Sequence, residues 1–173
     1  AVSPYADYNN CGRVILLAEA YAIHEQDLQT RPLDYGRLTM ERIVLGGYLT
    51  AADLMQAQRQ RRELCEEGNT GLFSRYDILL APSSLSPAPL IDAPQKSFPV
   101  SWPMQTLPFN VTGNPAMSIP VGFSKSGLPL SMQIVGKYFD EATVFRAGQA
   151  YEQATEWHQQ WPAMGAIADA SAA

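Results

Sequence analysis

The chain has 173 residues and a formal net charge of -5, and its hydrophobic and charged fractions of 46% and 17% are those of a globular rather than a disordered protein. This length is enough for one domain with a hydrophobic core. The acidic balance argues against a nucleic-acid partner, because binding phosphates needs a clustered basic surface.

Basic residues are dense in one place only, at Arg59, Arg61 and Arg62, and three glutamates follow closely. We interpret this cluster as the solvated face of a helix. The two cysteines, Cys11 and Cys65, have neither CxxC spacing nor a histidine at ligand spacing, which favours free thiols in a reducing compartment. Without a metal-ligand pattern or a phosphate-cradling loop, the sequence predicts no metal and no organic cofactor.

Membrane and secretion signals are not apparent. The apolar run at residues 14–18 is far too short to span a bilayer. The start of the chain carries no basic region followed by a long apolar stretch, so no secretory signal supports the glycosylation sequon at residues 110–112. We therefore expect a cytoplasmic protein with no membrane partner.

The first third of the chain is predicted to be helical. Residues 1–12 contain proline, glycine and two asparagines and indicate an irregular lead-in. Apolar residues spaced by three and four then predict a helix over residues 13–29. Pro32 ends that segment, and a shorter helical piece is expected over residues 38–45.

A second long helix is predicted to begin after Thr50. This threonine is a good N-cap, and Asp53 lies three residues on, close to a capping box. The helix should run to about Glu67, with Gly68 in the left-handed position past its end.

Residues 77–81 (DILLA) contain a short unbroken apolar run, which is typical of a strand buried on both faces. The following segment, residues 82–108, contains seven prolines and cannot hold a long helix or a central strand. Long ordered loops in compact domains are usually functional, so we expect this segment to cover a site.

Two further strands are predicted at residues 116–123 and 128–135, joined by turn residues 124–127 into a hairpin. Asp140 is a good N-cap for a last helix, expected over residues 141–157.

Three strands make a thin sheet, and the run at residues 77–81 needs neighbours that this chain does not supply. We therefore predict an α/β fold in which the chain is part of a mixed β-sheet covered by helices. Residues 1–162 would form this portion of a domain, and the alanine-rich residues 163–173 would be a flexible tail.

Three blocks of the chain resemble the amidase signature family. Residues 76–82 (YDILLAP) resemble its "DxLLxPT" strand, and residues 108–122 (PFNVTGNPAMSIPVG) resemble its "FNxTGxPAxSxPxG" block. Residues 127–136 (GLPLSMQIVG) are similar to "GLPxGxQxxG". Their order and spacing fit the family over roughly residues 13–162, which implies the carboxy-terminal part of its α/β fold.

The chain departs from the family pattern at two positions. Ser131 stands where the family usually has glycine, and Ser83 follows Pro82 where threonine is common. Each substitution could alter the shape of a substrate pocket.

The resemblance implies hydrolysis of a carboxamide by a serine nucleophile, a second bridging serine and a lysine base. In the family these residues lie in a Gly/Ser-rich stretch upstream of the matched region, so we expect no catalytic residue in this chain. A hydroxyl needs a neighbouring base and preorganised donors to attack at neutral pH. The chain alone is therefore predicted to be inactive.

The block at residues 108–122 supplies the candidate substrate-binding residues. Short polar side chains and glycines at these positions favour either a rigid lead-in to the strand or the lining of a substrate pocket. Under the second interpretation the substrate-binding residues are Asn110, Thr112, Gly113 and Ser118.

The residues of this chain are poor candidates to replace the missing catalytic serines and lysine. The pair Ser83–Ser84 has no flanking glycine to present an oxyanion hole, although Lys96 and Lys125 are available. Nothing marks His24 or His158 as part of a Ser-His-acid triad, and ordinary packing or surface roles are favoured.

Two functions remain open. The chain is either a fragment of an amidase that needs its N-terminal remainder as partner, or a non-catalytic binding or subunit module derived from that fold. The small amide substrate is not specified, and neither is a glutamine-ammonia role in a larger complex. Without the N-terminal remainder, the strand at residues 77–81 would expose open edges, so we expect the isolated fragment to self-associate.

Overall fold

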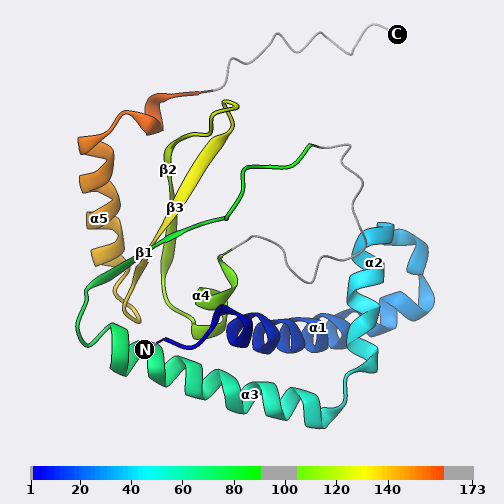
Figure 1. Ribbon diagram of the computed structural model, residues 1–173. Coiled ribbons are helices and arrows are strands. Elements are labelled where there is room, and N and C mark those ends of the chain that lie inside the picture. The colour runs from blue at the N-terminus through cyan, green and yellow to red at the C-terminus, as the bar shows by residue number, and fades with distance from the viewer. Residues whose placement is uncertain (1, 91–104, 162–173) are drawn as a thin grey trace, which may run out of the picture.

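The computed structural model describes residues 2–90 and 105–161, and the predicted tail at 163–173 lies outside them. Helices α1 and α3 lie side by side at the foot of the molecule and the sheet stands above them, with α5 along one side (Figure 1). The α-helices are α1 (Tyr5–Thr30), α2 (Arg37–Ile43), α3 (Ala51–Glu66), α4 (Leu107–Thr112) and α5 (Glu141–Ala154). Short 3-10 helices cover Pro32–Asp34, Val44–Tyr48 and Trp157–Gln159.

The sheet has the order β1-β3-β2, and both pairs are antiparallel. Its strands are β1 (Ile78–Pro82), β2 (Ala116–Phe123) and β3 (Pro129–Gly136). The predicted hairpin is confirmed, with Gly127 at φ 79° in the turn and its amide donating to the Ser124 carbonyl at 2.9 Å. Helices and sheet together confirm the α/β class.

The apolar core consists of two clusters. In the first, Tyr8, Cys11 and Ile15 of α1 pack with Ala57 and Leu64 of α3 and Val111 of α4. In the second, Ile119 and Ile134 of the sheet pack against Val144 of α5. Burial of the first cluster explains why α1 is longer than predicted.

The expectation of an irregular lead-in at residues 1–12 is wrong. Helix α1 begins at Tyr5, directly after Pro4, and includes Gly12. A Cβ at Gly12 would come within 2.7 Å of Val111 Cγ2, so the glycine permits close packing with α4 instead of breaking the helix. Local turn propensity is overridden here by burial.

The predicted capping box of α3 is confirmed, with Thr50 Oγ1 accepting from the Asp53 amide and Asp53 bonding back to the Thr50 amide. The predicted left-handed Gly68 is wrong. The chain instead continues as a π-helix over Glu67–Leu72, and Gly68 is buried without a positive φ. The side chain of Asn69 donates to the Cys65 carbonyl at 2.7 Å. This side chain therefore satisfies a carbonyl at the end of α3 without a left-handed turn.

Within this chain β1 is not buried on both faces. β1 is an edge strand paired only with β3, and Leu80 keeps 59% of its surface exposed. Too few strands and helices are present to cover it within the described residues, which agrees with the predicted shortage of strands.

The last helix is shorter than predicted. It starts at the Asp140 cap as expected, with Asp140 accepting from the Thr143 amide, but it ends at Ala154. The following short 3-10 helix brings Trp157 against Phe123 at the far end of the hairpin, with ring centroids 6.2 Å apart. No helix in the described ranges is both long and apolar enough to cross a membrane.

Candidate substrate-binding surface

The two faces of the sheet differ in chemistry. Side chains alternate between faces along a strand, so Ile119, Ile134 and their neighbours face α5. The opposite face carries Ser118 on β2 and both Ser131 and Gln133 on β3, with Ser118 paired to Gln133. The buried Val135 lies beyond Gln133 on this face, so the face is polar at one end only. With Ser83, which follows β1, these residues form what we call the polar sheet face.

Ser83 lies on the polar sheet face because the chain bends over the sheet after β1. Its amide donates to the Ser131 carbonyl at 3.1 Å, and its hydroxyl lies 3.1 Å from the hydroxyl of Ser118. Ser83 is buried, whereas Ser118 and Ser131 are exposed. Both departures from the family pattern, at positions 83 and 131, therefore fall on one surface, beside the predicted substrate-binding Ser118.

Gln133 is the most buried member of the polar sheet face, at 3% exposure. Its Nε2 donates to the Pro82 carbonyl at 3.2 Å and to the Gln105 carbonyl at 3.1 Å. The Gln105 amide in turn donates to the Ser83 carbonyl at 2.9 Å. Two stretches that are distant in sequence are thus joined above the sheet.

The other predicted substrate-binding residues lie in and after α4. Asn110 is exposed on this helix, and the buried Thr112 donates its hydroxyl to the Pro108 carbonyl at 3.1 Å. Gly113 follows at φ 77°, a backbone angle that favours glycine. The three residues form the end of α4 and the turn that follows it.

Side chains from elsewhere satisfy the last carbonyls of α4. Arg61 Nε donates to the Val111 carbonyl at 2.8 Å, and the Tyr138 hydroxyl donates to the Thr112 carbonyl. The Cys65 thiol lies 3.6 Å from the same Thr112 oxygen. These contacts join α4 to α3 and to the loop before α5, and they hold the Gly113 turn in place.

The interpretation of the arginine cluster as a solvated face is therefore wrong for Arg61. Arg59 and Arg62 are exposed, but Arg61 is half-buried and bonded to α4. Helical spacing separates these neighbours onto different faces, which a cluster read along the sequence does not reveal.

Two side chains that pack near α4, Tyr138 and Cys11, have raised pKa values. Burial raises the pKa of the Tyr138 phenol, and contact with Cys65 raises it further, so the hydroxyl stays a donor at neutral pH. Burial likewise raises the pKa of the Cys11 thiol, which donates to the Ala57 carbonyl at 3.2 Å. Both cysteines are free, as predicted.

A small hollow of about 230 Å³ lies between α1, α3 and α4 and contains Asn110 in its wall. The structure therefore places Asn110 at this hollow and Ser118 on the polar sheet face, with Thr112 and Gly113 in the backbone turn between α4 and β2. The hollow is lined by Gly12, Ile15, Leu16, Glu19, Arg61, Leu107, Asn110 and Val111.

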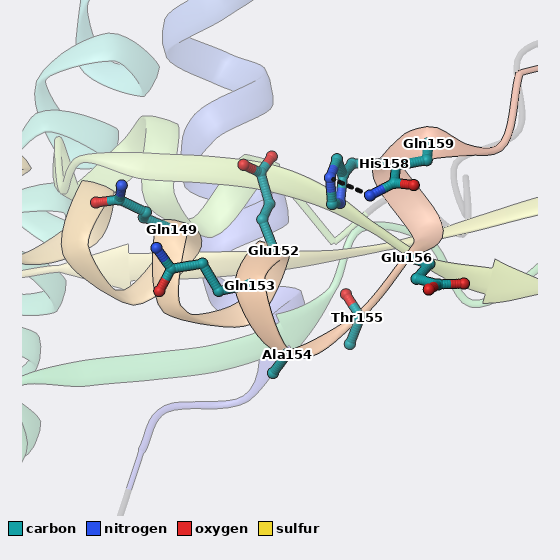
Figure 2. Close-up of a pocket in the computed structure, with 8 residues that line it drawn as sticks. All are labelled: Gln149, Glu152, Gln153, Ala154, Thr155, Glu156, His158 and Gln159. Atoms are coloured by element: carbon teal, nitrogen blue, oxygen red, sulfur yellow. Dashed lines mark hydrogen bonds between the residues drawn. The ribbon is translucent and has the colours of Figure 1, made fainter.

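A second, open hollow of about 490 Å³ lies at the end of α5. Figure 2 shows Glu152 and Glu156 pointing in different directions, and the one drawn hydrogen bond joins His158 to Gln159. Across the described residues, no group of three or more His, Cys, Asp or Glu side chains is placed to hold a metal.

The described part of the chain does not place a lysine or histidine base in hydrogen-bond contact with Ser83 or Ser118. Ser84 turns away from Ser83 and bonds the Ser86 carbonyl at 2.9 Å. His24 bonds the Tyr35 hydroxyl at 2.9 Å. Lys125 lies in the hairpin turn, and Lys96 falls outside the described residues.

Sequence reasoning missed Gln133, Arg61 and Tyr138 as residues of the site. Gln133 was visible as the glutamine of the block at residues 127–136, and the alternation of β3 placed it opposite Ile134. Nothing local in the sequence marks Arg61 or Tyr138, because their acceptors are backbone carbonyls of a distant segment.

Comparison with known proteins identifies the family. A family model described as amidase matches residues 2–145. The chain belongs to the amidase signature family. One relative, the A subunit of a glutamyl-tRNA(Gln) amidotransferase from Lysinibacillus sphaericus strain C3-41, is 40% identical over 144 residues. That match covers 79% of this chain and 29% of the relative. The protein of the same description from Chloroflexus aurantiacus is 36% identical over 84% of this chain and 31% of its own length.

Solved structures of the family agree with the fold. A protein from a vestigial complex, described as revealing the evolutionary origins of an s-triazine catabolic enzyme, superimposes with a TM-score of 0.77 at 27% identity. The superposition covers 87% of this amidase-family chain and 35% of that protein. A crystal structure described as amidase gives a TM-score of 0.71 at 26% identity over 82% of this chain and 34% of its own. The chain thus spans about a third or less of the relatives that it matches.

Proposed function

We propose that this chain is the carboxy-terminal portion of an amidase-signature hydrolase that cleaves a carboxamide C–N bond. In this proposal it supplies one flank of the sheet and the surface that covers the substrate. The observation that carries the proposal is the polar sheet face, on which the exposed Ser118 and Ser131 and the buried Ser83 present hydroxyls. Family membership supports the reaction class, and the N-terminal remainder would supply the Ser-Ser-Lys machinery.

The substrate-binding residues of this proposal are Asn110, Thr112, Gly113 and Ser118. Ser118 would contact the amide directly, because the residue is exposed and Ser83 orients its hydroxyl. Thr112 and Gly113 would act through the backbone turn between α4 and β2. A neutral hydroxyl surface suits a neutral carboxamide, which both donates and accepts hydrogen bonds.

Titrating the chain with small amides such as acetamide and benzamide tests this surface. We expect NMR shift changes concentrated at Ser118 and Ser131, and weaker binding in the Ser118→Ala variant. Exposed Ser126→Ala in the hairpin turn is the matched control. Shift changes that are unaffected by Ser118→Ala would refute the assignment.

The second candidate is a non-catalytic binding or subunit module on the same fold. Its support is that the described residues hold a serine pair without a bonded base. Reading the gene upstream separates the two. A Gly/Ser-rich stretch with a preceding lysine, in frame, supports the hydrolase, whereas a start codon close to Ala1 supports the module.

Self-association of the isolated chain is part of the proposal. β1 and β2 are both edge strands, and Leu80 and Phe123 on them are exposed. Open edges and apolar surface favour pairing between chains. A cytoplasmic location completes the proposal. Sedimentation should show species larger than a monomer, and a single monomeric species would contradict this.

A further inference from the structure

Gln133 is buried, whereas Ser118 and Ser131 on the same polar sheet face are exposed. A glutamine buried to 3% exposure in a strand is costly unless its carboxamide is hydrogen-bonded. Both of its hydrogen-bond partners are backbone carbonyls outside β3, at Pro82 and Gln105. Because a carbonyl only accepts, the end of the side chain that faces them must be the NH₂ group.

The two carbonyls belong to segments that are distant in sequence and meet at Gln133. Pro82 ends β1, and Gln105 lies just before α4. The same two segments share another hydrogen bond, because the Gln105 backbone amide donates to the Ser83 carbonyl at 2.9 Å. One side chain on the central strand therefore holds together the end of β1 and the approach to α4. We call these two hydrogen bonds the Gln133 bridge.

The bridge has a geometric consequence for the serines. Ser83 directly follows the bridged Pro82, and its hydroxyl reaches Ser118 on β2 even though β3 lies between β1 and β2. Without the bridge, Ser83 would be held only by its backbone hydrogen bonds to Ser131 and Gln105, and the 3.1 Å contact that orients the Ser118 hydroxyl would be weakened.

We propose that Gln133 is a positioning residue that sets the shape of the polar sheet face, and thereby determines which amides that face accepts. It acts through Ser83 and not by touching the substrate. The consequence for substrate choice rests on the proposed function, whereas the bridge itself does not.

Hydrogen exchange of the Ser83 and Gln105 amides in the full chain tests the bridge. In Gln133→Met, which keeps the shape but not the donor, we expect both amides to exchange about tenfold faster, the effect of two modest hydrogen bonds. The Gly136 amide, bonded to the Pro115 carbonyl at the other end of β3, should keep its protection. Exposed Gln149→Met on α5 is the matched control.

Gln133→Glu adds a signature that general destabilisation would not produce. A carboxylate has no proton to donate and would face two carbonyl oxygens, whereas a protonated carboxyl donates one hydrogen bond. Protection factors at Ser83 and Gln105 should therefore recover in part as the pH falls. The residues at the bridge and beside it on the sheet, Pro82, Gln105, Ala81 and Ser118, carry no titratable group that could cause this.

Three results would overturn the bridge. They are unchanged protection in Gln133→Met, equal loss at Gly136, and a flat pH profile in Gln133→Glu. Substrate choice is then read by titrating wild type and Gln133→Met with acetamide, propionamide and benzamide. The order of affinities should change, and an unchanged order would refute the specificity role. If no amide binds to either protein, the proposed function and the specificity role both fail, while the exchange data still decide the bridge.

Discussion

Replacing Arg61 by methionine should destabilise the chain far more than the same change at Arg59. Both arginines lie on α3, but only Arg61 is half-buried with its Nε donating to the Val111 carbonyl at 2.8 Å. A hydrogen bond from a charged donor contributes about 1.5–3 kcal/mol, and the partial exposure of Arg61 favours the lower half of that range. Methionine keeps most of the apolar stem, so the measured loss is mainly that of the hydrogen bond.

Urea unfolding followed by circular dichroism measures the free energy of unfolding of each variant. Arg61→Met should lose about 1.5–2 kcal/mol, whereas Arg59→Met should stay within about 0.5 kcal/mol of wild type, as exposed substitutions do. Equal losses in the two variants would refute the conclusion that Arg61 stabilises the α4 end.

Three further predictions concern the scaffold. Gly46→Ala should lose about 2 kcal/mol or more in urea unfolding, because its Cβ would lie 2.1 Å from the Leu17 carbonyl oxygen, whereas Gly36→Ala, with open space around it, should not be destabilised. Asn114→Ala should lose about 1–3 kcal/mol by thermal unfolding, since the buried Asn114 amide donates to the Gly136 carbonyl at 2.9 Å; an unchanged Tm would count against this. Hydrogen bonds from Thr50 lower the pKa of Asp53, so the stability that the cap contributes is fully present above the ordinary aspartate pKa and is lost as the pH falls through the folded value. Thr50→Ala should therefore weaken the acid dependence of unfolding, and an identical pH profile in the variant would contradict the assignment.

The sequence predicted the elements whose signals are local. The capping box at Thr50, the cap at Asp140 and the hairpin around Gly127 all use residues within a few positions of one another. The α/β class followed from the same elements.

The predictions that failed concern residues whose structure is set by contacts with distant parts of the chain. Gly12 lies within α1 and permits close approach of α4, whereas an irregular lead-in was predicted there. At the end of α3, the side chain of Asn69 bonds the Cys65 carbonyl in place of the predicted left-handed Gly68. The sequence did not show that Ser118 lies beside Ser83 in the candidate site. The pairing of β2 with β3 brings Ser118 there. Gln133 and Arg61 bond backbone carbonyls, which carry no mark in the sequence.

In our interpretation, the residues of this chain shape a surface for an amide and do not attack it. Incubating the purified full chain with acetamide, propionamide and benzamide, and measuring released ammonia, tests this most directly. No release above the buffer background is predicted, because Ser83 and Ser118 bond each other without a bonded base among the described residues. Ammonia release that disappears in Ser83→Ala or Ser118→Ala would contradict this interpretation.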